Sequence, residues 1–137
     1  MYKESRSFGA RCDESAIMRN RYPDRIPIVI EPRTPKTPSI DKRKYMTPKD
    51  LTFGQLFFIV RKRLNLRQED ALFFYMNNNI LVPTTSTIHA VYETNRDEDG
   101  FLYIGYSLEN TFGWKTDDVF STKSYLNGSW RIRSTFF

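Results

Sequence analysis

The chain has 137 residues, of which 39% are hydrophobic and 15% aromatic, with 21 Lys and Arg against 16 Asp and Glu. This length fits one globular domain, and the 11 Phe and 8 Tyr supply enough apolar surface for a core, which excludes a disordered, collagen-like or coiled-coil chain. The net charge of +5 favours anionic partners, but scattered Lys and Arg that keep a small domain soluble are the simpler explanation.

The sequence has no pattern typical of a membrane span or a secretion signal. Its longest uninterrupted apolar runs, 56–60 and 71–76, are far shorter than the roughly 20 residues that a membrane-spanning helix needs. Residues 1–15 lack the apolar core of a secretion signal, and the single Cys12 cannot form an internal disulfide. We therefore expect a reducing, cytosolic compartment.

The N-terminal part predicts helices followed by a strand. Residues 10–21 mix small, charged and apolar side chains and end before a proline, which is typical of a short amphipathic helix, and 1–9 are expected to form a first turn or a small helix. Residues 26–31 are rich in β-branched side chains, and Pro27 predicts that this strand begins at an edge or irregularly. The three prolines in 32–39 indicate a loop, and a basic stretch then leads into a strand ending at Pro48.

The best predicted helix follows. Thr52 and Gln55 have the spacing of a capping box, in which each side chain accepts from the other residue's backbone N–H. One face of the helix then carries Phe53, Leu56, Phe57, Val60 and Leu64. The apolar run 71–76 predicts a strand buried on both faces, 84–87 should cap a short helix, and 101–106 should form the last strand. We expect the segment after Gly113 to be a tail.

The sequence offers little that is typical of catalysis. With one Cys and one His, at positions 12 and 89, a zinc site would need several carboxylates that show no recognisable spacing. His89 is expected on a helix surface, and Cys12 is expected to be an inert small side chain. Neither a glycine-rich phosphate-binding loop nor a dinucleotide fingerprint occurs. The sequence therefore predicts no metal, no cofactor and no enzymatic activity.

The strand at 44–48 is the best candidate binding element. It can pair with 26–31, and it is rimmed by Lys42, Arg43, Lys44 and Arg63. An exposed edge strand accepts an extended peptide through main-chain hydrogen bonds, and a basic rim favours acidic peptides. The alternative, which the residues alone favour, is that these cations only guard an edge against aggregation.

Eight strings stand in order along the chain. They are YPDRIPIVIE (22–31), DKRKY (41–45), PKDLT (48–52), GQ (54–55), IVRKR (59–63), DALFF (70–74), DGFLY (99–103) and ENTFG (109–113). In these strings the chain resembles the ubiquitin-like modifiers of autophagy, the GABARAP and light-chain-3 family. The resemblance implies an α+β, ubiquitin-like β-grasp fold, with a four-stranded sheet around a central helix and one or two extra N-terminal helices. It also implies a helical extension (1–21), a core (22–113) and a tail that is a propeptide (114–137).

The resemblance further implies processing and lipidation at Gly113. A cysteine protease would cut between Gly113 and Trp114, and the activating and conjugating enzymes of autophagy would then link the glycine carboxylate to phosphatidylethanolamine. The lipid's two acyl chains would anchor the protein stably, so it would move from the cytoplasm to the autophagosome membrane. The 24-residue tail at 114–137 is long for a propeptide of this family, which leaves open whether it is removed or has its own function.

The second implied activity is docking of cargo receptors and adaptors through peptides of the form aromatic-x-x-aliphatic, added as a strand beside 44–48. The implied aromatic pocket is lined by Glu14, Met18, Pro27, Val29, Lys44, Met46 and Phe101. The implied aliphatic pocket is lined by Tyr45, Thr47, Pro48, Leu51, Leu56, Ile59 and Arg63. Arg25 and Lys42 would meet acidic residues near the peptide. Ordinary core packing is the alternative for Met18, Val29, Leu51 and Ile59, and both roles can hold at once.

Met46, Thr47 and Leu56 depart from the residues usual in the family, so an altered peptide preference is expected.

The competing hypothesis is a basic module that binds RNA or the cytoskeleton through 42–44 and 61–63, and microtubules are a further candidate partner. Binding that weakens steeply with salt would favour that hypothesis.

Overall fold

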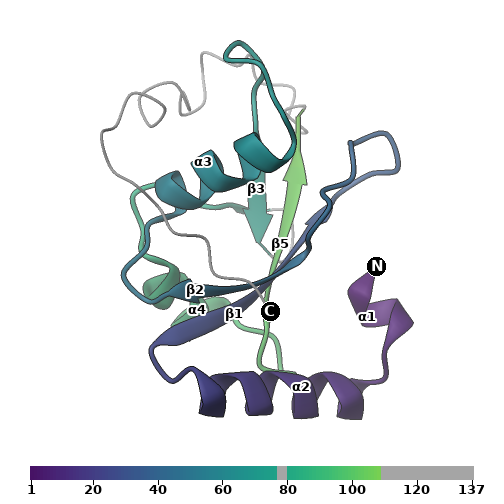
Figure 1. Cartoon of the computed structure of the whole chain (residues 1–137), viewed down its shortest axis with the longest axis vertical. Coiled ribbons are helices and arrows are strands. Elements are labelled where there is room, and N and C mark those ends of the chain that lie inside the picture. The colour runs from purple at the N-terminus through teal and green to yellow at the C-terminus, as the bar shows by residue number, and fades with distance from the viewer. Residues whose placement is uncertain (77–79, 109–137) are drawn as a thin grey trace.

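The structure is a computed structural model that describes residues 1–76 and 80–108 (Figure 1). Its elements are α1 (Tyr2–Ser5), α2 (Phe8–Arg21), β1 (Arg25–Pro32), β2 (Lys44–Pro48), α3 (Phe53–Arg63), β3 (Phe73–Met76), β4 (Ile80–Leu81), α4 (Ile88–Asn95) and β5 (Leu102–Ser107). The predicted cleavage site and the tail lie outside the described residues, as does the segment 77–79.

The strands form one mixed sheet in the order β2-β1-β5-β3-β4. β1 and β5 are parallel neighbours at its centre, and the other pairs are antiparallel. The sheet has five strands rather than the expected four, because Ile80 and Leu81 pair with Met76 and Tyr75. A two-residue strand is too short to show a period in the sequence, so periodicity could not reveal it.

The start of β1 is placed as Pro27 predicts. Pro27 lies opposite Met46 of β2, whereas the pairing with β5 begins only at Ile28. The first residues of β1 therefore have a strand on one side only. The missing N–H of the proline interrupts no hydrogen bond to β5, which is where a sheet tolerates this residue.

The core lies between the sheet and α3, which crosses one face of it (Figure 1). The predicted capping box is present, with the Gln55 N–H donating to Thr52 Oγ1 at 3.2 Å and the Thr52 N–H donating to Gln55 Oε1 at 2.9 Å. Behind it, the rings of Phe57 and Phe74 stack with their centroids 4.2 Å apart. This apolar packing accounts for the position of α3 over the sheet.

α2 lies along one end of the molecule and is held there by the residues that lead into β5 (Figure 1). Arg11 Nη1 lies 2.5 Å from Asp99 Oδ2, and the Ser15 hydroxyl donates to the Asp99 carbonyl oxygen. Gly100 has a φ of +95°, and a Cβ there would collide with Ser15 Oγ. The close approach of α2 thus requires glycine at this position.

Arg61 is a structural residue, although the sequence presents it as part of a basic cluster. Its side chain donates to the carbonyl oxygens of Asp70 and Arg67, both at 2.6 Å, and only 4% of the residue is exposed. Burial lowers the pKa of its guanidinium. The competing hypothesis of a basic module at 61–63 is therefore wrong about this cation, because it faces backbone carbonyls rather than solvent.

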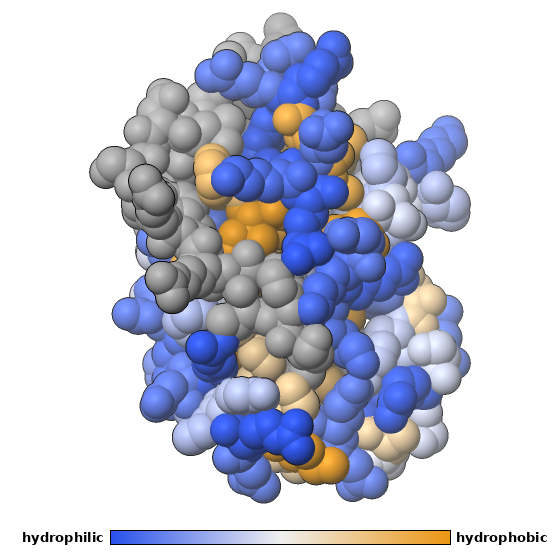
Figure 2. Space-filling model, viewed as in Figure 1, coloured by the Kyte–Doolittle hydropathy of each residue, from blue (hydrophilic) through white to orange (hydrophobic). Residues whose placement is uncertain are grey.

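Hydrophilic residues cover most of the described part of the face in Figure 2, and hydrophobic residues appear there as separate small areas. No helix in the described ranges is long and apolar enough to span a bilayer.

Candidate functional site

β2 forms one end of the sheet in the described part of the chain. Its inner edge pairs with β1 along its whole length, from Lys44 opposite Val29 to Pro48 opposite Arg25. Among residues 1–76 and 80–108, no strand pairs with its outer edge. The predicted binding strand is thus an edge strand, whose outer N–H and C=O groups can accept a further strand.

The register of β1 and β2 divides the expected site residues into two sets. Side chains alternate between the two faces of a strand, and opposite residues in an antiparallel pair share a face. Lys44 and Met46 therefore lie on one face with Val29 and Pro27. Tyr45 and Thr47 lie on the other face with Ile28 and Ile26, which belong to the core under α3.

The first set, expected to form the aromatic pocket, gathers between α2 and the sheet. Glu14 and Met18 are one helical turn apart on α2, and Glu14 Oε2 accepts from Lys44 Nζ at 2.8 Å. Val29 and Phe101 are fully buried, Met46 is 1% exposed, and Pro27 is also buried. Met18 is only half-buried, so core packing alone does not account for it.

The second set, expected to form the aliphatic pocket, belongs largely to the core. Leu51, Leu56 and Ile59 pack in the main hydrophobic cluster, as does the ring of Tyr45. The Tyr45 hydroxyl donates to the Lys42 carbonyl oxygen at 2.6 Å, and burial raises the pKa of that hydroxyl. Core packing is therefore observed for Leu51 and Ile59. Val29 of the first set is also fully buried, but on the other face of the sheet. Contact of these residues with a peptide stays a prediction.

Of the remaining residues of this set, Thr47 and Pro48 end β2, and Arg63 ends α3. Thr47 is buried and its hydroxyl contacts the Ile26 carbonyl oxygen at 3.4 Å, whereas Pro48 is half-buried. Arg63 Nη1 pairs with the Asp41 carboxylate at 3.0 Å. Arg43, Lys44 and Arg63 of the basic rim expected from the sequence thus each lie close to a carboxylate.

The two cations expected to meet acidic residues lie at opposite ends of β2. Arg25 stands opposite Pro48 and lies over the ring of Tyr22, with 6.0 Å between the guanidinium carbon and the ring centroid. Lys42 precedes β2 and lines an open hollow of about 630 Å³, together with Tyr2, Glu31 and Lys44 among others. The two cations are therefore placed to meet different parts of an extended ligand.

The structure adds Tyr2, which sequence analysis missed. Its ring meets the ring of Phe101 edge-on at a centroid distance of 5.7 Å, and its hydroxyl donates to Glu14 Oε1. Lys44 Nζ lies 5.1 Å from the centroid of the same ring. A single aromatic residue at the start of a chain carries no period, so nothing local in the sequence indicated this contact.

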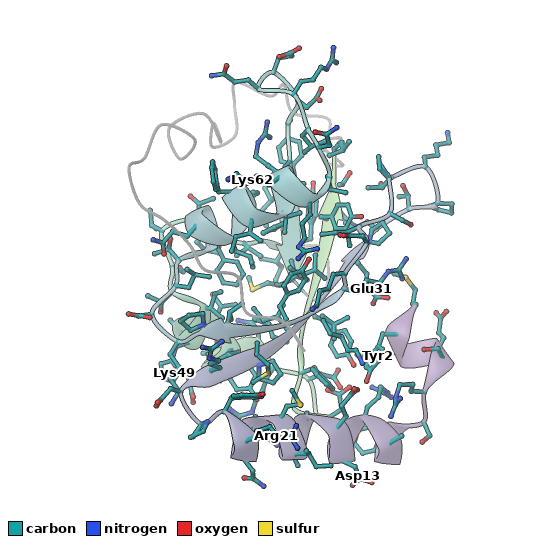
Figure 3. The ribbon with its side chains drawn as sticks, viewed as in Figure 1. Tyr2, Asp13, Arg21, Glu31, Lys49 and Lys62 are labelled. Carbon is teal, nitrogen blue, oxygen red and sulfur yellow. The ribbon has the colours of Figure 1, made fainter. Side chains whose placement is uncertain are left out.

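Glu31 binds the backbone of Tyr2. Its Oε2 accepts from the Tyr2 N–H at 2.8 Å and lies 3.4 Å from Arg43 Nη1. Burial raises the pKa of the Glu31 carboxyl, and the N-terminal amino group and Arg43 partly offset this. Figure 3 shows Tyr2 reaching from α1 toward the sheet, close to Glu31.

His89 occupies a surface position, as predicted. It lies on α4 with its Nδ1 3.8 Å from Glu93 Oε1, and both side chains are about half exposed. Within the described ranges, no group of three or more His, Cys, Asp or Glu residues could hold a metal ion.

A mixed sheet with parallel central strands, an antiparallel edge hairpin and a helix packed across one face defines a ubiquitin-like β-grasp protein. The chain belongs to the Atg8 family, because the family model described as "Autophagy protein Atg8 ubiquitin like" matches residues 10–113. Members of this family are ubiquitin-like modifiers and not enzymes, in agreement with the expectation from the sequence.

Two solved Atg8 structures are also similar to this chain. The chain is similar to Trypanosoma brucei ATG8, with 40% identity, a TM-score of 0.72, and 77% of this chain and 91% of that chain covered. It is also similar to Plasmodium falciparum Atg8 in complex with a Plasmodium falciparum Atg3 peptide, with 33% identity, a TM-score of 0.72, and 80% of this chain and 97% of that chain covered.

The predicted conjugation residue Gly113 and the predicted cleavage partner Trp114 lie outside the described residues. The match to the family model ends at residue 113.

Proposed function

We propose that this chain is a modifier that is cleaved after Gly113 and conjugated to phosphatidylethanolamine on autophagosomal membranes. Before lipidation it resides in the cytoplasm. The support is the ENTFG string at 109–113 together with a family match that ends at the same glycine. Glycine suits this role because, without a Cβ, it passes through narrow catalytic channels and leaves its carbonyl carbon accessible to attack.

The second part of the proposal is that cargo receptors and adaptors dock as an added strand on β2. The observation that carries it is the division of the expected site residues between the two faces of that strand. In an extended peptide, residues three apart point to opposite faces, so an aromatic-x-x-aliphatic motif directs its two anchors to opposite sides of the sheet. The aromatic anchor would lie beside α2, and the aliphatic anchor would lie beside α3.

A related structure supports peptide docking in general. Plasmodium falciparum Atg8 was solved in complex with an Atg3 peptide, and it shares 33% identity with this chain. We propose that this chain binds a peptide of the same kind, in addition to those of cargo receptors.

Conjugation is tested by the intact mass of the protein recovered from its own cells, next to a Gly113→Ala variant. We expect a species that ends at Gly113 and carries a lipid-sized addition, both absent from the variant. A wild-type protein that always retains 114–137 and never gains lipid would overturn this part of the proposal.

Docking is tested by changing the peptide, so that folding of the protein is not at issue. Calorimetry would compare an aromatic-x-x-aliphatic peptide with versions carrying Ala at the aromatic or the aliphatic position. We expect each replacement to weaken binding at least about tenfold, as for a buried hot-spot anchor. Equal affinity for a scrambled peptide of the same composition would overturn the docking proposal.

The competing basic module makes a different prediction. It requires binding to RNA whose affinity falls steeply with salt. Arg61 is buried against backbone carbonyls, and Lys44 and Arg63 are each paired with a carboxylate, which leaves this hypothesis with weaker support. Tight, salt-sensitive RNA binding without peptide binding would restore it.

A further inference from the structure

The side chain of Tyr2 is directed into the molecule, although it belongs to a short surface helix. α1 spans four residues and none of them is buried. Figure 3 shows the Tyr2 side chain extending from this helix toward the sheet rather than into solvent. Its orientation therefore comes from specific contacts and not from burial of α1 as a whole.

Those contacts are made with residues of the predicted aromatic pocket. The Tyr2 ring packs edge-on against Phe101, its hydroxyl donates to the Glu14 carboxylate, and Lys44 Nζ lies over its face. Glu14 in turn accepts from Lys44 at 2.8 Å, so the phenol and the ammonium share one carboxylate. An aromatic ring with a polar tip thus already occupies three of the groups that an incoming aromatic residue would contact.

The apolar lining of that pocket is closed in this structure. Val29 and Phe101 have no exposed surface, and Met46 is 1% exposed. A site that stood ready for an aromatic ring would leave such side chains partly accessible. A peptide must therefore displace something before its ring reaches them.

We propose that Tyr2 is a specificity-determining residue of the peptide site, an aromatic plug built into the chain that competes with the aromatic residue of an incoming peptide. This inference rests on the proposed docking function. The plug opens when α1 leaves Glu14 and Phe101, and peptides are selected by how well their own ring and polar groups replace those of Tyr2.

The attachment of α1 is weak enough for such an exchange. A four-residue helix is far too short to be stable by itself, so its contacts with the body hold it in place. Besides the Tyr2 N–H bond to Glu31, the segment is held by Lys3, whose Nζ lies 2.5 Å from Asp97 Oδ1 and 4.6 Å from the centroid of the Tyr103 ring. Lys3 is 43% exposed, and ion pairs of this kind contribute little to stability.

The test compares peptide affinity in wild-type protein, Tyr2→Ala and Tyr2→Phe. If the plug is closed in about two thirds to nine tenths of molecules, its removal tightens binding by about threefold to tenfold. The gain should appear as a faster association rate, because the plug must leave before the ring enters. Tyr2→Phe keeps the contact with Phe101 and loses the bond to Glu14, so its affinity should fall between the other two.

Phe8→Ala is the matched control. Phe8 is another aromatic residue near the N-terminus, it is 49% exposed, and its ring lies near Arg11 rather than near the pocket. We expect its replacement to leave peptide affinity unchanged. Thermal unfolding of each variant would show whether its fold is retained.

The outcomes separate the two levels of the proposal. Unchanged or weaker peptide binding by Tyr2→Ala overturns the plug while leaving docking intact. If Tyr2 instead formed a wall of the site that contacts the peptide, its truncation would lower the affinity. An equal gain in Phe8→Ala also overturns it, since the effect would then not belong to Tyr2. Absence of peptide binding in every variant overturns the docking proposal, and the plug with it.

Discussion

Lys44 and Glu14 form an ion pair that joins β2 to α2, with Lys44 Nζ 2.8 Å from Glu14 Oε2. The pair crosses the space between the edge strand and the helix, where the predicted aromatic pocket lies. Its two side chains are 32% and 20% exposed, so it is neither a fully solvated nor a buried pair.

A double-mutant cycle with Glu14→Gln and Lys44→Met measures this interaction. Because solvent still reaches both groups, we expect a coupling free energy of about 0.5–1 kcal/mol in urea unfolding. The more exposed pair of Glu93 on α4 and Arg96 at its C-terminal cap, 3.7 Å apart, serves as the control and should give a smaller coupling. A coupling no larger than that of the control would contradict the prediction.

Glu31→Gln should stabilise the protein at neutral pH. Burial raises the pKa of the Glu31 carboxyl, so the folded protein binds this proton more tightly than the unfolded chain does. Stability therefore falls as pH rises from the ordinary glutamate pKa through the raised one, and ionised Glu31 is the less stable form. The glutamine oxygen can still accept from the Tyr2 N–H.

Urea unfolding at several pH values checks this prediction. The gain in the free energy of unfolding should be present at pH 7 and disappear below about pH 4, where the carboxyl is protonated in both states. Glu93→Gln, at a 55% exposed side chain on α4, is the control. A less stable Glu31→Gln protein at pH 7 would show that the negative charge is needed there.

Gly100→Ala should destabilise the docking of α2. The positive φ disfavours any L side chain, and the new Cβ would collide with the Ser15 hydroxyl. We expect a loss of about 1–3 kcal/mol in the free energy of unfolding. Gly9→Ala is the matched control, because no atom beyond its chain neighbours and its own helix backbone lies within 4 Å of its added Cβ, and alanine favours the helix. Equal effects at the two positions would contradict this account.

Arg61→Met should destabilise the protein strongly. The substitution leaves the carbonyl oxygens of Arg67 and Asp70 without their buried donor, for which we expect a loss of about 2–4 kcal/mol by thermal or urea unfolding. Lys62→Met changes the neighbouring cation at an exposed position and should be nearly neutral. If both substitutions are neutral, Arg61 does not organise the segment after α3.

Local patterns accounted for much of the fold. The capping box at Thr52 and Gln55 begins α3, and the apolar run before residue 77 includes a buried interior strand, β3. Pro27 correctly indicated that the first residues of β1 pair with a neighbouring strand on one side only. These features depend on residues within a few positions of one another, so hydrogen-bonding capacity and side-chain period are enough to predict them.

By itself, the sequence determined the family and the order of the elements other than β4, since ordered strings and hydrophobic periods are local properties. Only the tertiary structure decided that Tyr2 meets Phe101, that Arg61 is buried, and that β2 ends the described sheet. Such contacts join residues far apart in the chain, and they depend on the shape of the space between packed elements. That shape cannot be inferred from a period or a spacing along the sequence, because the space between the elements exists only once the core has formed.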